Sequence, residues 1–181
     1  MRVGWLVSGQ GKMLEYVDTC MSSDVAIVVA DRECEAFCNT DNPRILVPRV
    51  AFGSREKFSD EILNHLEKND VDFVCCTFDS LLSGRILDRY RGRLINFHPG
   101  RLPEFAGIKA IERTIGSGVE FGGCTVHHID DGVDTGNIIA EARIKIPKSC
   151  SVERYGEMVY HIGRELMLQI VKGYEDGTYS E

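Results

Sequence analysis

The sequence has no long apolar run, and basic residues are fewer than acidic ones. The first apolar stretch, residues 3–7, is far too short for a signal peptide or a membrane span, and no later run approaches about twenty residues. The 21 Lys and Arg stand against 28 Asp and Glu, which gives a net charge of −7. A general nucleic-acid binder needs a basic face. We therefore predict a cytoplasmic protein that binds neither nucleic acid nor a membrane.

The cysteines lack the pattern of a disulfide framework or of a metal site. There are seven, an odd number, and several stand in apolar surroundings where a thiol packs like a small hydrophobic group. Cys34 and Cys38 are spaced like metal ligands, but no second pair or histidine cluster completes a site. We predict reduced cysteines and no metal. Repeats and linkers are also absent, so residues 1–181 are interpreted as a single domain.

Short apolar segments alternate with amphipathic ones along the chain. The expected strands are residues 1–8, 25–30, 44–48, 72–77, 94–97, 123–129 and 138–146. The expected helices are residues 12–20, 54–69, 82–90, 108–117 and 151–173. This alternation predicts an α/β fold of right-handed βαβ units, in which a mostly parallel, twisted, Rossmann-like sheet has helices on both faces. Residues 31–43 show no clear pattern.

A glycine turn at residues 8–11 separates the first strand from the first helix. Backbone N–H groups in such a turn can face a phosphate or a carboxylate, although a turn without any ligand fits equally well. The full dinucleotide-binding fingerprint is absent, because Leu14 stands where its third glycine belongs. The candidate substrate-binding residues here are Ser8, Gly9, Gly11, Lys12 and Met13.

The strand at residues 94–97 ends in an amide and an imidazole. Asn96 and His98 point to the same side of an extended chain, and Pro99 keeps the exit from the strand extended. An amide donor beside an imidazole can stabilise an oxyanion and move a proton, whereas a lone histidine at a strand end is more often structural. Asp134, on a glycine-flanked loop 36 positions after His98, favours the catalytic alternative.

Two further features near Asp134 are weaker. His127 and His128 point to opposite faces of their strand, so at most one joins the site, and His127 is assigned a supporting, substrate-binding role. The acidic loop at residues 130–134 lacks the ligand spacing of a calcium loop. One carboxylate acting on one histidine is the simpler interpretation.

Three segments together resemble the folate-dependent formyltransferase family, and within it the small glycinamide ribonucleotide transformylases of purine synthesis. They are VSGQG (7–11), INFHPGRLPEFAG (95–107) and GGCTVHHIDDGVDTGNIIAEA (122–142). The resemblance implies the formyltransferase fold and 10-formyltetrahydrofolate as the formyl donor. It implies that Asn96 and His98 donate to the oxyanion, and that Asp134 orients His98 and helps carry a proton from the acceptor amine to the folate nitrogen. It requires no metal.

The resemblance also implies a pterin pocket and a small amine acceptor. The implied folate-binding residues are Phe78, Asp79, Ser80, Leu81, Leu82, Asp130, Gly132 and Val133. The chain departs from the family pattern where the acceptor binds, because Lys12 and Met13 stand in place of Ser and Asn. Ser80 likewise stands where an arginine is common.

Several functions share this motif set. Glycinamide ribonucleotide or a similar phosphorylated amine is the first candidate acceptor, followed by an amino-sugar nucleotide or an amino acid. A hydrolase that releases formate from the folate would also use Asn96, His98 and Asp134. A catalytically inactive folate-binding protein would need only the pocket. Transfer to tRNA is disfavoured by the acidic composition. The sequence does not indicate an oligomeric state.

Overall fold

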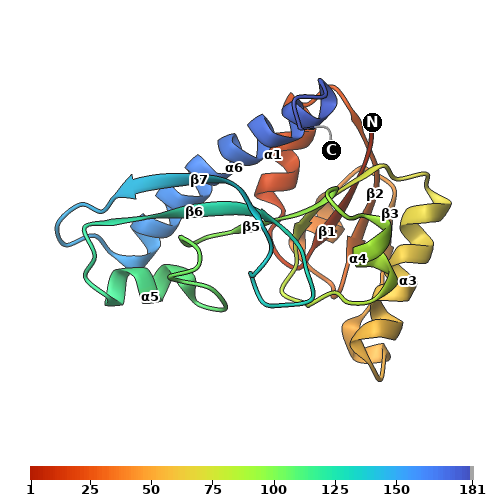
Figure 1. Ribbon diagram of the computed structural model, residues 1–181, viewed down its shortest axis with the longest axis horizontal. Coiled ribbons are helices and arrows are strands. Elements are labelled where there is room, and N and C mark those ends of the chain that lie inside the picture. The colour runs from red at the N-terminus through yellow and green to blue at the C-terminus, as the bar shows by residue number, and fades with distance from the viewer. Residues whose placement is uncertain (180–181) are drawn as a thin grey trace.

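The computed structural model describes residues 1–179 (Figure 1). Its strands are β1 (Arg2–Val7), β2 (Asp24–Ala30), β3 (Arg44–Leu46), β4 (Phe73–Thr77), β5 (Leu94–His98), β6 (Phe121–His128) and β7 (Ile138–Lys145). Its helices are α1 (Lys12–Cys20), α2 (Glu35–Asn39), α3 (Arg55–Lys68), α4 (Arg85–Arg89), α5 (Ala110–Gly116) and α6 (Val152–Glu175), with a 3-10 turn η1 (Arg49–Ala51). The predicted alternation of strands and helices is confirmed.

The strands form one sheet in the order β3-β2-β1-β4-β5-β6-β7. The pairs from β3 to β5 are parallel, whereas β5–β6 and β6–β7 are antiparallel. The chain leaves β1 towards β2 on one side and returns as β4 on the other. Parallel sheets bind ligands outside the carboxyl ends of the strands at such a reversal. The topology therefore predicts a ligand site at the carboxyl ends of β1, β4 and β5.

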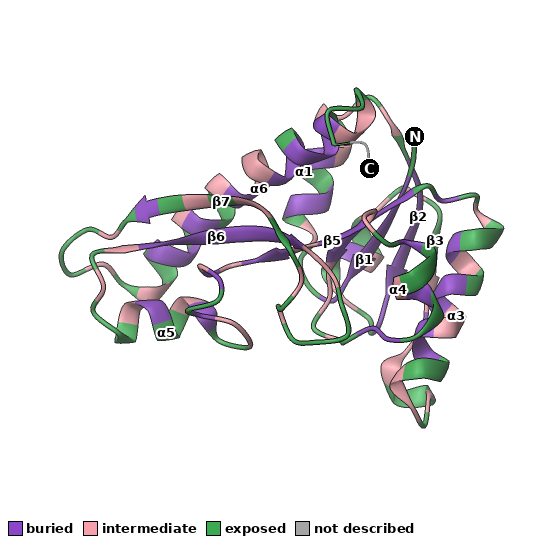
Figure 2. Cartoon of the chain, viewed as in Figure 1, coloured by how far each residue is buried: buried purple, intermediate pink, exposed green. Residues whose placement is uncertain are grey.

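Helices cover both faces of the sheet, as predicted. One apolar cluster includes Leu14 and Val17 of α1 and Val171 of α6, and the other includes Phe58 and Ile62 of α3. Strands β1, β2, β4, β5 and β6 are mostly buried, whereas the edge strands β3 and β7 are more exposed, and the helices turn their polar faces outward (Figure 2). Continuous apolar strands such as β2 fold this way because both of their faces need covering.

The two longest helices begin at serine caps. The Ser54 side chain accepts from the Lys57 N–H at 3.2 Å, and the Ser151 side chain accepts from the Arg154 N–H at 3.1 Å. Each bond satisfies one of the free N–H groups of a first helical turn. Both starts agree with the sequence-based boundaries. No helix within residues 1–179 is long and apolar enough to cross a membrane.

The structure differs from the prediction mainly in short elements. The helix expected over residues 82–90 is confined to α4, and the unassigned region contains α2. Helix α2 is held by the Ala36 N–H, which donates to the Gly9 carbonyl at 3.0 Å. A Cβ at Gly11, where φ is 79°, would lie 2.5 Å from the Ala36 Cβ, so this turn requires glycine. These contacts are tertiary and leave no periodic pattern.

Candidate functional site

Adjacent strands bring Asn96 and His127 together. Asn96 pairs in register with Cys76 of β4 on one side and with His127 of β6 on the other. The Asn96 Nδ2 lies 3.3 Å from the His127 Nε2. The His127 Nδ1 is 2.8 Å from the His128 carbonyl oxygen, so the backbone fixes the orientation of the imidazole ring.

Asp134 meets both histidines through its two carboxylate oxygens. Its Oδ2 is 3.2 Å from the His98 Nδ1, and its Oδ1 is 3.4 Å from the His127 Nε2. The Gly107 N–H donates to Oδ2 at 2.8 Å. Asp134 has a φ of 53°, in the left-handed region that few non-glycine residues occupy. Asn96, His98 and Asp134 therefore lie close together as predicted, and His127 contacts both Asn96 and Asp134.

His98 lies behind Asp134 and is only 4% exposed. Its Nε2 is 2.9 Å from the Phe105 carbonyl oxygen, and its Nδ1 faces Asp134, so both nitrogens are engaged within the protein. The loop that carries Phe105 is tied to β6, because the Thr125 hydroxyl donates to the Gly100 carbonyl at 2.8 Å and accepts from the Leu102 N–H at 3.2 Å. His98 is thus placed to hold Asp134 in position.

The loop between β6 and β7 is folded by Asp130. Its Oδ1 accepts from the Gly132 N–H at 3.0 Å and from the Thr135 hydroxyl at 2.7 Å. Arg55 of α3 donates to the Asp131 carboxylate at 2.8 Å and links the loop to the far helix layer. The two hydrogen bonds of Asp130 fix the position from which Asp134 projects.

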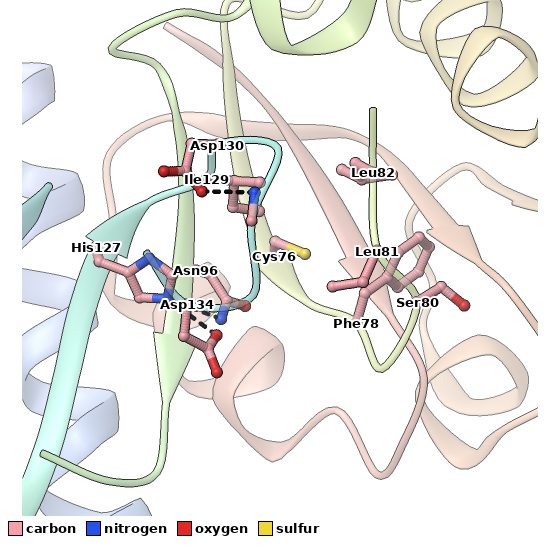
Figure 3. A pocket seen from close by; sticks show the side chains of 11 residues that line it. Cys76, Phe78, Ser80, Leu81, Leu82, Asn96, His127, Ile129, Asp130 and Asp134 are labelled. Carbon is pink, nitrogen blue, oxygen red and sulfur yellow. Dashed lines mark hydrogen bonds and ion pairs between the residues drawn. The ribbon is translucent and has the colours of Figure 1, made fainter. Parts of the chain in front are cut away.

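A cavity opens between this cluster and the loop after β4. Figure 3 shows Asn96, His127 and Asp134 on one side, Phe78 and Leu81 across from them, and Cys76 between. The hollow contains about 420 Å³ of space between protein atoms, a volume that includes open solvent, and about 60 Å³ of it is open to the centre of a water-sized sphere. Its lining residues are Cys76, Phe78, Ser80, Leu81, Leu82, Asn96, His127, Ile129, Asp130, Gly132 and Asp134.

Most of the predicted folate-binding residues line this cavity, but two do not. Asp79 turns to Arg32, with 3.4 Å between the Asp79 Oδ2 and the Arg32 Nη1, and Val133 is absent from the lining. Cys76 and Ile129 were missed by sequence reasoning, because an apolar residue at a strand end has the same pattern as a core residue. The register of Cys76 with Asn96 is what brings it to the cavity.

The predicted anion-binding turn lies beside the same edge of the sheet. The Ser8 hydroxyl accepts from the Asp79 N–H at 2.9 Å, which confirms that the ends of β1 and β4 are neighbours. Gly9 and Lys12 are exposed at this turn. The Met13 side chain is buried in the apolar core, so the predicted contact of Met13 with a ligand would come from its backbone N–H.

The site holds a carboxylate charge at neutral pH. Burial raises the pKa of Asp134, but hydrogen bonds from His127 and Gly107 and the charge of His98 outweigh it, so the pKa lies below its usual value. Burial likewise lowers the pKa of His98, against the opposing effects of Asp134 and the Phe105 carbonyl. Burial raises the pKa of Cys76 to about 12, so its thiol stays neutral.

The lowered pKa of His98 predicts that acid destabilises the fold. Below about pH 6.5 the unfolded chain binds a proton at this residue more readily than the folded chain, so the free energy of unfolding decreases as the pH is lowered. Replacing His98 by Asn removes the contribution of this residue to the pH dependence of stability. Chemical denaturation between pH 8 and 5.5, above the range where Asp134 titrates, should show the wild type losing up to about 1.4 kcal/mol more per pH unit than the variant. Parallel curves would contradict this prediction.

Metal ligation and disulfides have no support within residues 1–179. No group of three or more His, Cys, Asp or Glu side chains there is placed to hold a metal ion. All seven cysteines are free thiols, and Cys34 and Cys38 do not form a disulfide.

Several known proteins are similar to this chain in sequence. It is 34% identical over 157 residues to a trifunctional purine biosynthetic protein adenosine-3 from Drosophila pseudoobscura pseudoobscura, which covers 80% of this chain but only 12% of the relative. It is 27% identical over 178 residues to the phosphoribosylglycinamide formyltransferase of Bacillus subtilis, covering 91% of this chain and 90% of that protein. The matched region therefore spans about an eighth of that trifunctional relative and nearly all of the bacterial one.

Solved structures and a family comparison agree with these relatives. Glycinamide ribonucleotide transformylase 1 from Symbiobacterium toebii superposes with a TM-score of 0.92 at 28% identity, over 98% of this chain and 88% of that one. Phosphoribosylglycinamide formyltransferase from Bacillus halodurans gives 0.88 at 27% identity, over 93% and 92%. The fold is thus the formyltransferase fold. With residues 1–171 matching the formyl transferase family, the chain belongs to that family.

Proposed function

We propose that the protein transfers a formyl group from 10-formyltetrahydrofolate to a primary amine of a small acceptor. The observation that carries the proposal is the position of Asn96, His127 and Asp134 at the wall of a cavity whose opposite wall is apolar. Such a cavity can hold a reactive centre against polar groups while it keeps water away. Residues 1–181 act as one catalytic domain in this proposal.

The cavity suits the flat ring system of a folate. Phe78, Leu81 and Ile129 offer apolar contacts to the faces of a ring, and Asp130 offers a carboxylate to its edge. Cys76 adds a neutral thiol, which packs like an apolar group. A pterin needs both kinds of contact, because its faces are aromatic and its edge carries N–H donors.

The polar wall supplies the chemistry of acyl transfer. The amine nitrogen attacks the formyl carbon, and an N–H of Asn96 donates to the oxyanion that forms. Asp134 helps to carry one proton from the amine nitrogen to the folate nitrogen as the bond from that nitrogen to the formyl carbon breaks. His98 was expected to donate to the oxyanion, but its ring does not line the cavity; held between Asp134 and the Phe105 carbonyl, it instead keeps the carboxylate aimed at the reacting atoms. The products are a formamide and tetrahydrofolate.

Glycinamide ribonucleotide is the first candidate acceptor. Two of the similar proteins are named for acting on it, and Lys12 stands exposed at the start of α1, where a phosphate would meet a cation and free N–H groups. The chain would then act in purine biosynthesis in the cytoplasm. An amino-sugar nucleotide or an amino acid remains the alternative, because Met13 presents no side chain to the turn.

A screen of amines tests the proposal. The protein is mixed with 10-formyltetrahydrofolate and with glycinamide ribonucleotide, an amino-sugar nucleotide or ornithine, and the appearance of tetrahydrofolate is followed. Amine-dependent turnover is expected. Turnover without any amine would indicate a hydrolase instead, and folate binding without turnover against all the amines would indicate a binding protein.

A further inference from the structure

We infer that the outer edge of β7 is a docking surface for a second copy of this chain, so that two sheets join into one through a pair of antiparallel β7 strands. The inference does not depend on the proposed formyl transfer. It rests on the free edge of β7, the direction of its backbone groups, and a strand sequence that is complementary to itself.

Within residues 1–179 the sheet has two edge strands, and β7 offers the longer edge. Strand β7 has eight residues, pairs with β6 on one side and ends the strand order of the sheet (Figure 1). The other edge strand, β3, has three residues, with Pro43 directly before it and Pro48 two positions after it. Short edges and prolines both discourage the addition of a strand. The longer β7 edge, which contains no proline, can accept one.

The backbone groups of alternate β7 residues point away from β6. Just after the strand, the Ile146 N–H donates to the Glu120 carbonyl at 2.9 Å, so Ile146 faces the β6 side. The backbone groups alternate in direction along a strand, so those of Ala142 also face β6, whereas those of Glu141 and Arg143 face outward. In the part of the chain that the structure describes, no strand pairs with these outward N–H and C=O groups.

The sequence of β7 matches itself when a second copy runs antiparallel with Ala142 opposite Ala142. In that register, Glu141 of each copy lies directly opposite Arg143 of the other, and Ala140 lies opposite Ile144. Opposite charges stabilise such a cross-strand pair, whereas like charges destabilise it. Centring the two copies on residue 141 or residue 143 instead would place two like charges opposite each other. The charges therefore select one register and favour a second copy of the chain.

Both charged side chains are held on the same exposed face of the hairpin. The Glu141 Oε1 lies 3.3 Å from the Arg101 Nε, and the Arg143 guanidinium lies over the Phe121 ring, 4.2 Å from its centroid. The second carboxylate oxygen and the guanidinium N–H groups remain for the other copy. Ala142 is small, so its side chain leaves room for the two strands to approach where they cross the symmetry axis.

Analytical ultracentrifugation of the full chain tests the interface. The mass should rise from 20.3 kDa towards twice that value as the concentration is raised to about 0.5 mM, because small interfaces bind weakly. Arg143→Glu places a carboxylate opposite Glu141 and should weaken the dimer about tenfold or more. Adding Glu141→Arg restores opposite charges and should restore the dimer. Lys148→Glu, the same charge change on an exposed residue beyond the strand, is the matched control and should dimerise like the wild type.

Hydrogen exchange measured by NMR tests the same edge without any substitution. The N–H groups of Glu141 and Arg143 should exchange more slowly as the protein concentration is raised, because the second copy accepts from them. The N–H of Ala142 faces β6 in the single chain, so its exchange rate should not change. This comparison does not require the charge variants to fold, and thermal melting shows whether they do.

Each outcome decides the inference. A wild type that keeps a mass of 20.3 kDa at every concentration would overturn it. A dimer that Arg143→Glu does not weaken, or that the reversed charge pair does not restore, would show that the copies meet elsewhere. Exchange at Glu141 and Arg143 that is independent of concentration would show the same. The paired edge contains no residue of the cavity lining, so these results and the amine screen fail separately.

Discussion

Replacing Asp134 by Asn should lower kcat by about 10³-fold or more while the folate still binds. The substitution changes one oxygen to an amide nitrogen and leaves the shape of the side chain. Asn also tolerates the left-handed backbone that Asp134 adopts, with its φ of 53°. The Gly107 N–H can still donate to the remaining oxygen. The loss therefore reports the missing charge rather than a disturbed loop.

The charge matters because both histidines are arranged around it. Asp134 contacts His98 at 3.2 Å and His127 at 3.4 Å, and its lowered pKa keeps it ionised at neutral pH. The measurement is steady-state kcat and KM with the best amine from the screen. Asp131→Asn on the same loop is the control, since its exposed ion pair with Arg55 contributes little. Similar kcat values for the two variants would contradict the role assigned to Asp134.

The sequence predicted the strands and long helices because their apolar residues repeat at the period of the element. The expected starts of α1 and α3 agree with the structure, and Ser54 is the N-cap that the sequence indicated. The antiparallel direction of β6 and β7 was not specified, because a buried strand has the same apolar pattern in either direction. Helix α2 was missed because a contact with Gly9 stabilises it, rather than its own five residues.

The residues of the candidate site were easier to predict than its shape. Asn96, His98 and Asp134 were identified from residue types and spacing, and the structure brings them together. The burial of His98 behind Asp134 depends on the Phe105 carbonyl, a backbone group that no side-chain pattern reports. The burial of the Met13 side chain follows from its four-residue spacing from the buried Val17, which places both on one helix face.

Replacing Gly163 by Ala should cost about 1–3 kcal/mol in the free energy of unfolding, because the new methyl group enters occupied space. Gly163 lies in α6 against Phe97 of β5, and an added Cβ would be 2.2 Å from the Phe97 Cε2. The Phe97 ring is buried and also packs against the Tyr160 ring of the same helix, with 5.7 Å between the centroids, so the ring, the helix or the strand must shift.

A shift of β5 would also reach the site, because Phe97 stands between Asn96 and His98 on the same strand. Gly156→Ala in the same helix is the matched control, since its Cβ would lie 3.6 Å from the nearest atom, an Ile111 methyl group. That variant should gain about 0.5–1 kcal/mol from the better helix propensity of alanine. Urea unfolding of both variants measures the difference, and kcat measured beside it shows whether the strand has moved. Equal stabilities for the two variants would contradict this prediction, because they would show that the contact between α6 and β5 can relax.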